Sequence, residues 1–154
     1  MSQQLQIQIK KLHPEVQTPF YATPGSAGFD LRAFLMDSSS ITIPAGKRAK
    51  VTTGLQMVLP EGYELQIRPR SGLAFKHGIS LTNTPGTIDC DYRGEIQILM
   101  INHGEEDFTI EHGDRIAQAV LAPIYQASFE EITELPSEED NKRLAGGFGS
   151  SGVK

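Results

Sequence analysis

Apolar and polar residues alternate along much of the chain with a period of two. In the first such run, Leu5, Ile7 and Ile9 alternate with glutamine and lysine, which gives one apolar and one polar face. Further short runs predict strands over residues 41–43, 49–53, 55–59, 63–67, 95–101, 108–110, 115–124 and 128–132. Turn-forming sequences such as PAG, PEG, TPG, NHG and EHG separate them. Many short, closely spaced strands predict an all-β fold, a jelly-roll-like sandwich or barrel.

One short helix is expected over SGLAFKHG (71–78), with Ser71 in the N-cap position and Gly78 closing it. The length of 154 residues suits one domain with a substantial core. From Pro136 the composition changes to PSEEDNKR and then to a tail rich in glycine and serine. We therefore expect a β-rich core domain over residues 1–135 and a flexible C-terminal arm over residues 136–154.

Composition narrows the classes of protein that the chain can be. A formal net charge of −5 argues against a general nucleic-acid or anionic-membrane binder, although a few local cations could still hold a small anion. A single cysteine, Cys90, excludes an internal disulfide framework and a zinc site built on several thiolates. The chain shows no signal-peptide pattern and no apolar run of membrane-spanning length. We expect a cytoplasmic protein.

The stretch RPRSGLAF (68–75) is the first whose residues suit ligand binding. A strand that ends in Arg-Pro-Arg and continues through Ser-Gly into a helix presents backbone N–H groups, a hydroxyl and guanidinium groups at one helix N-terminus. That combination suits a phosphate group. The pattern alone equally allows a capped helix with two surface arginines.

The stretch NTPGTIDCDYRGE (83–95) predicts a hairpin whose tip holds Asp89, Asp91 and Tyr92. Acidic residues in turns most often make local hydrogen bonds. However, Ile88 and the apolar strand that follows place Asp89 near the edge of a core. A lone carboxylate is unusual there and suggests a functional role.

Three further stretches are weaker signals. AGFDLRA (27–33) is an early strand that carries two charged side chains. In GDRIAQAVL (113–121) the period of two places Arg115 and Gln118 on opposite faces. RLAGGFGSSG (143–152) is glycine-rich but lacks the lysine and the strand–helix context of a P-loop, which we reject.

Together and in this order, the segments AGFDLRA, PRSGLA, GTIDCDYRGE, GDRIAQ and GGFGSSG resemble the homotrimeric dUTPase (deoxyuridine 5'-triphosphate nucleotidohydrolase) family. They span residues 27–152. Two positions depart from the usual pattern: Leu144 follows Arg143 where the family usually has glycine, and Cys90 occupies a position that varies. The resemblance implies a jelly-roll-like trimer with active sites between subunits. The C-terminal arm of one chain closes a site that two others build.

The resemblance also implies a reaction, the hydrolysis of dUTP to dUMP and pyrophosphate. Such a dUTP diphosphatase supplies dUMP for thymidylate synthesis and keeps uracil out of DNA. Asp89 is the implied catalytic carboxylate, which orients and deprotonates the water that attacks the α-phosphorus. Mg²⁺ is the implied cofactor, and Asp30 approaches it through water only. No nucleic acid or membrane partner is implied.

The implied substrate-binding residues come from several segments of the chain. Those implied for the phosphates are Arg70, Ser71, Gly72 and Gln118. Those implied for uracil are Asn83, Thr87, Ile88 and Gln97, while Tyr92 packs against deoxyribose and excludes a 2′-hydroxyl. The arm contributes Arg143, Phe148, Gly149, Ser150 and Ser151, with Phe148 stacked on uracil and Arg143 and the serines near the phosphates.

Two other functions remain to be weighed. A dCTP deaminase-type relative on the same trimeric scaffold would be expected to carry a catalytic glutamate in the hairpin region, where this chain reads TIDCDY. A non-catalytic, nucleotide-sensing trimer would bind dUTP without releasing pyrophosphate. All matched catalytic positions are filled here, which argues against that function as the sole one.

Overall fold

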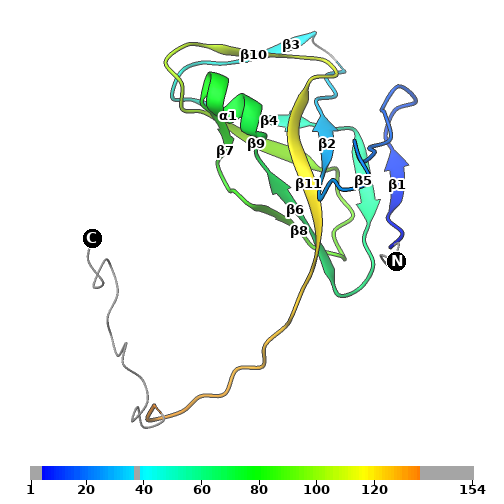
Figure 1. Cartoon of the computed structure of the whole chain (residues 1–154), viewed down its shortest axis with the longest axis vertical. Coiled ribbons are helices and arrows are strands. Elements are labelled where there is room, and N and C mark those ends of the chain that lie inside the picture. The colour runs from blue at the N-terminus through cyan, green and yellow to red at the C-terminus, as the bar shows by residue number, and fades with distance from the viewer. Residues whose placement is uncertain (1–4, 37–38, 136–154) are drawn as a thin grey trace.

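The structure is a computed structural model that describes residues 5–36 and 39–135. Within these residues the chain is built from short strands and one helix (Figure 1). In chain order the elements are β1 Gln8–Lys11, β2 Phe29–Arg32, β3 Ser40–Ile43, β4 Arg48–Thr52, β5 Leu55–Val58, β6 Tyr63–Arg68, α1 Ser71–His77, β7 Ile79–Leu81, β8 Gly86–Ile88, β9 Gln97–Asn102, β10 Phe108–Glu111 and β11 Arg115–Pro123. The predicted all-β architecture with one short helix is confirmed.

The strands form four antiparallel sheets. The largest has the order β2-β11-β6-β8, and a three-stranded sheet has the order β4-β9-β7. The pairs β1-β5 and β10-β3 complete the architecture. Neighbours within the sheets are mostly far apart in sequence, so the pairing depends on long-range contacts.

Alternation along the strands builds the hydrophobic core. On β6, Leu65 and Ile67 are buried, whereas Gln66 between them is half-buried. On β9, Ile98 and Met100 are buried, and Leu99 between them is exposed. The buried faces of the two larger sheets contribute most of one shared core. The period of two therefore marks which face of each strand turns inward.

The strand predicted over residues 128–132 is wrong. The last strand ends at Pro123, and residues 124–135 contain no strand. This segment leads away from the sheets (Figure 1) and leaves Tyr125 and Phe129 96% and 97% exposed. A segment with an alternating pattern forms a strand only when it pairs with the free edge of a sheet. Within the described part of the chain, this segment pairs with no sheet edge.

The helix is confirmed, but its predicted N-cap is wrong by one residue. Arg70 is the N-cap, in an extended conformation (φ −94°, ψ 129°) with no side-chain capping bond, and Ser71 is the first helical residue. Gly78 closes the helix with φ 67°, a left-handed conformation that favours glycine. None of the helical residues is buried. Nowhere in the described ranges is a helix long and apolar enough to cross a membrane.

Candidate active site

The register of the largest sheet lines up three polar side chains. Gln118 on β11 pairs with Asp30 on β2 and, on its other side, with Arg68 on β6. Directly paired residues point to the same face of a sheet, so the three side chains form a row across it. This row lies where β6 ends and the chain turns into α1.

Asp30 is the centre of a small ionic cluster. Its Oδ1 accepts a hydrogen bond from Nε of Arg70 at 2.9 Å, and its Oδ2 lies 3.4 Å from an Arg115 guanidinium nitrogen. The Asp30 side chain is 32% exposed, so the cluster is open to solvent. Two guanidinium groups around one carboxylate leave a net positive charge, which suits an anionic ligand.

A β-bulge explains why Arg115 joins this cluster. The register of β11 against β2 shifts between Arg115 and Ala117, and Ile116 and Ala117 are both buried in succession. The prediction that Arg115 and Gln118 lie on opposite faces is therefore wrong, because one inserted residue reverses the alternation between them. Both side chains face Asp30.

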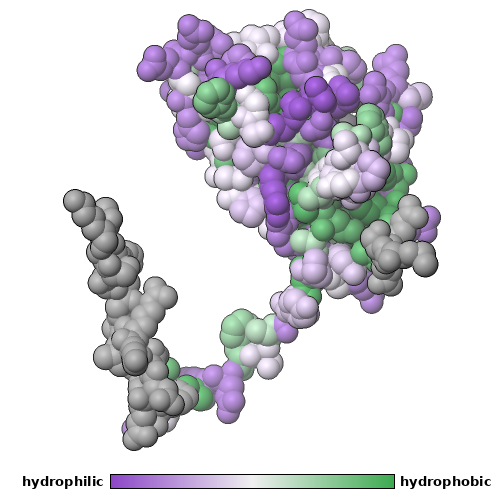
Figure 2. Space-filling model, in the orientation of Figure 1, coloured by the Kyte–Doolittle hydropathy of each residue, from purple (hydrophilic) through white to green (hydrophobic). Residues whose placement is uncertain are grey.

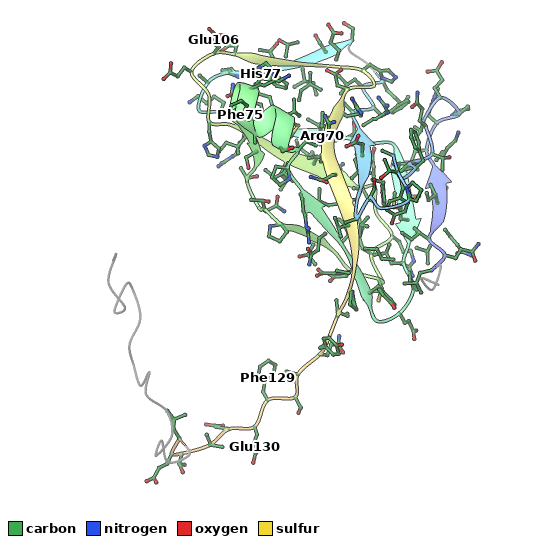
Figure 3. The ribbon with its side chains drawn as sticks, viewed as in Figure 1. Arg70, Phe75, His77, Glu106, Phe129 and Glu130 are labelled. Carbon is green, nitrogen blue, oxygen red and sulfur yellow. The ribbon has the colours of Figure 1, made fainter. Side chains whose placement is uncertain are left out.

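The segment from Pro69 to Gly72 is fixed against β11 by two hydrogen bonds. The Gln118 amide donates to the Pro69 carbonyl at 2.9 Å, and Arg70 Nη1 donates to the Arg115 carbonyl at 3.1 Å. Ser71 and Gly72, which follow, are exposed. Figure 3 shows Arg70 beside α1, at the end of the sheet. The predicted phosphate-binding residues Arg70, Ser71, Gly72 and Gln118 thus lie together, with Asp30 among them.

Asp89 and Tyr92 lie in a loop that connects two different sheets. The predicted hairpin is wrong in its pairing, because β8 pairs with β6, whereas β9 pairs with β4 and β7. The loop is closed by a hydrogen bond from the Tyr92 N–H to the Asp89 carbonyl and by Arg93, whose side chain donates to the carbonyls of Cys90 and Tyr92. Asp89 is exposed, and its carboxylate makes no hydrogen bond to another described residue.

The four residues predicted for uracil flank this loop. Thr87 and Ile88 lie on β8 directly before it, and Gln97 begins β9 directly after it. Asn83 lies in the turn that precedes β8. Ile88 is half-buried against the core, while the other three are exposed. Thr87, Ile88 and Gln97 thus adjoin the ends of the loop that carries Asp89 and Tyr92, and their contact with uracil stays a prediction.

Within one chain, however, Asp89 is distant from the ionic cluster. Ile88 on β8 pairs with Leu65 on β6, so Asp89, one residue further along, lies level with residue 64. Asp30 lies level with Arg68, because both residues pair with Gln118 on β11. Four residues along the strands correspond to about 13 Å, and three strand spacings across the sheet to about 14 Å, which gives a separation of about 20 Å. One chain cannot bring both groups to the same phosphate.

A cleft of about 390 Å³ includes part of the cluster. Asp30 and Arg115 line it on one side, with His112 and the ring of Phe20 among the remaining walls. Arg70, Gln118 and the loop residues are not part of it. The candidate site is thus an open surface in the single chain. Sequence reasoning did not assign Arg115 to it, because no sequence signal marks the bulge.

An all-β scaffold with a positively charged cluster and a separate loop that presents a carboxylate suits the class of proteins that act on a small phosphorylated ligand. Comparison with known proteins gives the family. The dUTPase family profile matches residues 14–152. A protein of Rhizobium rhizogenes named deoxyuridine 5'-triphosphate nucleotidohydrolase is 56% identical over 135 residues, 88% of this chain and 85% of the relative. One of the same name from Nautilia profundicola is 53% identical over 148 residues, 96% and 99% of the two chains. The chain belongs to the dUTPase family.

Solved structures agree with this assignment. The dUTPase of Staphylococcus bacteriophage 80alpha, in a structure with dUPNHPP, matches with a TM-score of 0.83 and 25% identity over 96% of this chain and 99% of that one. A dUTPase of phage phi11 of S. aureus, described with a structural Mg(II) ion, matches with a TM-score of 0.75 at 21% identity over 86% and 99%, which supports the fold alone. The family and fold predicted from the sequence are confirmed.

Proposed function

We propose that this chain is a dUTP diphosphatase, which hydrolyses dUTP to dUMP and pyrophosphate in the cytoplasm. The product supplies thymidylate synthesis, and the reaction keeps uracil out of DNA. The observation that carries the proposal is the family match over residues 14–152, which includes both the Asp30 cluster and the Asp89 loop. The comparisons do not favour a dCTP deaminase or a non-catalytic sensor.

The cluster around Asp30 supplies the phosphate end of the site. Arg70 is held at 2.9 Å by Asp30, so its guanidinium group is oriented before substrate arrives. Gln118 fixes the Pro69 carbonyl, which sets the backbone path to Ser71 and Gly72. The first helical hydrogen bond runs from the Ala74 N–H to the Arg70 carbonyl, so the Ser71 and Gly72 N–H groups precede it and can donate to phosphate oxygens.

Asp89 supplies the general base. Its carboxylate is exposed and makes no hydrogen bond to another described residue, so it is free to accept a proton from the attacking water. General-base assistance contributes about 10²–10⁴ in rate. The remaining acceleration has to come from positioning and from charge neutralisation by the arginine and backbone donors.

The donor set fits a hydrated Mg²⁺ that arrives with the triphosphate. Nowhere in residues 5–36 and 39–135 do three or more His, Cys, Asp or Glu side chains gather to hold a metal. Asp30 already accepts from two guanidinium groups, which leaves it suited to contact through water. When bound, Mg²⁺ neutralises phosphate charge and keeps several waters.

Base selectivity follows from hydrogen bonding at the loop. Backbone groups at Thr87 and Ile88, with Asn83 and Gln97, would pair with uracil and leave a donor facing a donor when cytosine enters. A site built on such hydrogen bonds can reject the wrong partner by about 10⁴. The thymine methyl group would collide with the closed turn around Asp89.

Three observations support a homotrimer with shared sites. The separation of about 20 Å between Asp89 and Asp30 requires a second copy to complete one site. The segment after β11 exposes Tyr125, Phe129 and Leu135 in a single chain. Figure 3 shows Phe129 on this segment, away from the sheets. An apolar groove of about 190 Å³ is lined by apolar residues within 5–9, by residues 19–21, by Phe29 of β2 and by Leu121 of β11, and its Phe20 is 68% exposed. Figure 2 shows apolar surface on the side of the molecule that carries the N-terminal strand. Exposed apolar surface of this kind is typical of subunit interfaces.

The proposal includes the C-terminal arm, residues 136–154, which lies outside the described residues. We expect Arg143, Phe148, Gly149, Ser150 and Ser151 to close over a nucleotide held by two other subunits and to exclude water during the reaction.

Pyrophosphate release from dUTP, dCTP, dTTP and UTP in the presence of Mg²⁺ tests the function. We expect release from dUTP alone. Ammonia release from dCTP would instead identify a deaminase, and dUTP binding without pyrophosphate would identify a sensor.

A further inference from the structure

Gly94 lies directly against the ring of Tyr92. A Cβ atom built on Gly94 would collide with Oη and Cζ of Tyr92 and would lie 3.0 Å from Cε2. The backbone of Gly94 is not among the glycines with positive φ, so its conformation does not itself demand glycine. A side chain at this position fits only if the Tyr92 ring moves.

The ring is folded back over its own turn and anchored at its far end. Tyr92 Oη donates to the Glu95 carbonyl at 3.0 Å, and the Tyr92 N–H donates to the Asp89 carbonyl at 3.1 Å. The backbone of Tyr92 and the far end of its side chain are thus each held by a hydrogen bond, while the residue remains 43% exposed. One surface of the ring is therefore available to a ligand.

The acceptor of the Tyr92 hydroxyl is itself immobilised by the turn between β4 and β5. The Glu95 carboxylate accepts from the Gly54 N–H at 2.7 Å. The next residue, Ile96, donates to the Leu55 carbonyl at 2.8 Å and accepts from the Thr53 hydroxyl at 2.6 Å. These three bonds join the base of the loop to the turn between β4 and β5.

We infer that Gly94 and Glu95 are positioning residues that set the preference for 2′-deoxyribose by holding the Tyr92 ring still. The inference depends on the proposed function and on the role that the family resemblance implies for Tyr92, packing against deoxyribose. A 2′-hydroxyl is excluded only if the ring cannot retreat, because a small displacement would make room for one oxygen atom. The rigidity of the ring then matters as much as its presence.

The first test replaces Gly94 with alanine and measures kcat/KM for UTP and dUTP. We expect the UTP:dUTP ratio to rise at least about tenfold, with a smaller loss on dUTP. Gly25→Ala is the matched control, since nothing lies within 4 Å of its Cβ position and its φ is not positive, and it should leave the ratio unchanged. A wild-type ratio in Gly94→Ala would overturn the inference.

A double-mutant cycle tests whether Gly94 acts through the tyrosine. Tyr92→Phe removes the bond to Glu95 and one of the two colliding atoms, so the ring is already free to shift, and Gly94→Ala should raise the ratio less in that background than in the wild type. If the effects of the two substitutions on the UTP:dUTP ratio simply multiply, Gly94 acts on the ratio by a route that does not involve Tyr92.

A third comparison separates positioning from folding at Glu95. Glu95→Gln keeps an oxygen acceptor for the Gly54 N–H and should retain the wild-type ratio, whereas Glu95→Ala should raise it. An Ala variant with a lowered Tm but an unchanged ratio would make the role of Glu95 structural only. Calorimetric binding of dUDP and UDP gives the same sugar preference without turnover. If the wild type cleaves no dUTP, the proposed function fails, and binding still tests this inference.

Discussion

Replacing Asp89 with asparagine removes one negative charge and leaves the shape of the side chain almost unchanged. The carboxylate is exposed and has no hydrogen bond to another described residue, so the folded chain loses no contact. We expect a change in stability within about 0.5 kcal/mol. In the proposed reaction the same substitution removes the general base.

The expected loss of kcat is about 10²–10⁴. At about 1.36 kcal/mol per decade, this corresponds to about 2.7–5.5 kcal/mol in the activation barrier, several times the change in stability. Nucleotide affinity should remain largely intact, because Asp89 adds only repulsion toward a bound polyphosphate. Catalysis should thus fall without loss of binding or assembly.

The assay combines pyrophosphate release from dUTP, dUDP binding by calorimetry, and light scattering for the oligomeric state. Asp91→Asn is the matched control, since it makes the same change at another exposed position of the same loop, and it should retain activity within about threefold. Full activity of an assembled Asp89→Asn enzyme would refute the role of Asp89. Equal losses of activity in both variants would indicate that the charge of the loop matters, and that Asp89 does not act as a specific base.

Four further outcomes are expected. Truncation before Arg143 should abolish catalysis and leave the proposed trimer intact, as measured by light scattering, and an active truncated enzyme would contradict a closing arm. Phe148→Ala should weaken nucleotide binding more than assembly, and equal losses would argue against stacking. Arg115→Ala removes the 3.4 Å contact between Arg115 and Asp30, and the Arg115 side chain is 52% exposed. We expect kcat/KM to fall about tenfold while Tm changes little. A large loss in Tm would show that the role of Arg115 is structural. Met100→Ala, at 0% exposure, should cost about 2–5 kcal/mol in thermal unfolding, and a smaller loss would contradict close packing there.

Much of the fold could be predicted from local pattern. Alternation along residues 63–67 predicted the strand β6 and its buried Leu65 and Ile67, and glycine at position 78 predicted the end of α1. The five family motifs predicted the phosphate and loop residues, which the structure brings into two separate groups. These features depend on neighbours in the sequence, so the sequence carries them directly.

Other features depend on which strands pair, and local pattern does not contain that information. The segment 128–132 has the alternation of a strand, but no edge in the described chain pairs with it. The loop after Ile88 looked like a hairpin, yet its two strands join different sheets. Strand pairing is decided by contacts between distant residues, which compete for the same edges.

The sequence by itself determined the strand content, the helix and the residue types that a triphosphate requires. Only the tertiary structure decided that Arg70 and Arg115 both contact Asp30. A bulge in β11 places Arg115 on the same face as Gln118 and Asp30, whereas regular alternation would place Arg115 and Gln118 on opposite faces. Only the tertiary structure placed Gly94 beneath the ring of Tyr92, where one methyl group would not fit. A bulge and a ring contact each depend on three-dimensional packing, in which a shift of one residue or one atom changes what a side chain can reach.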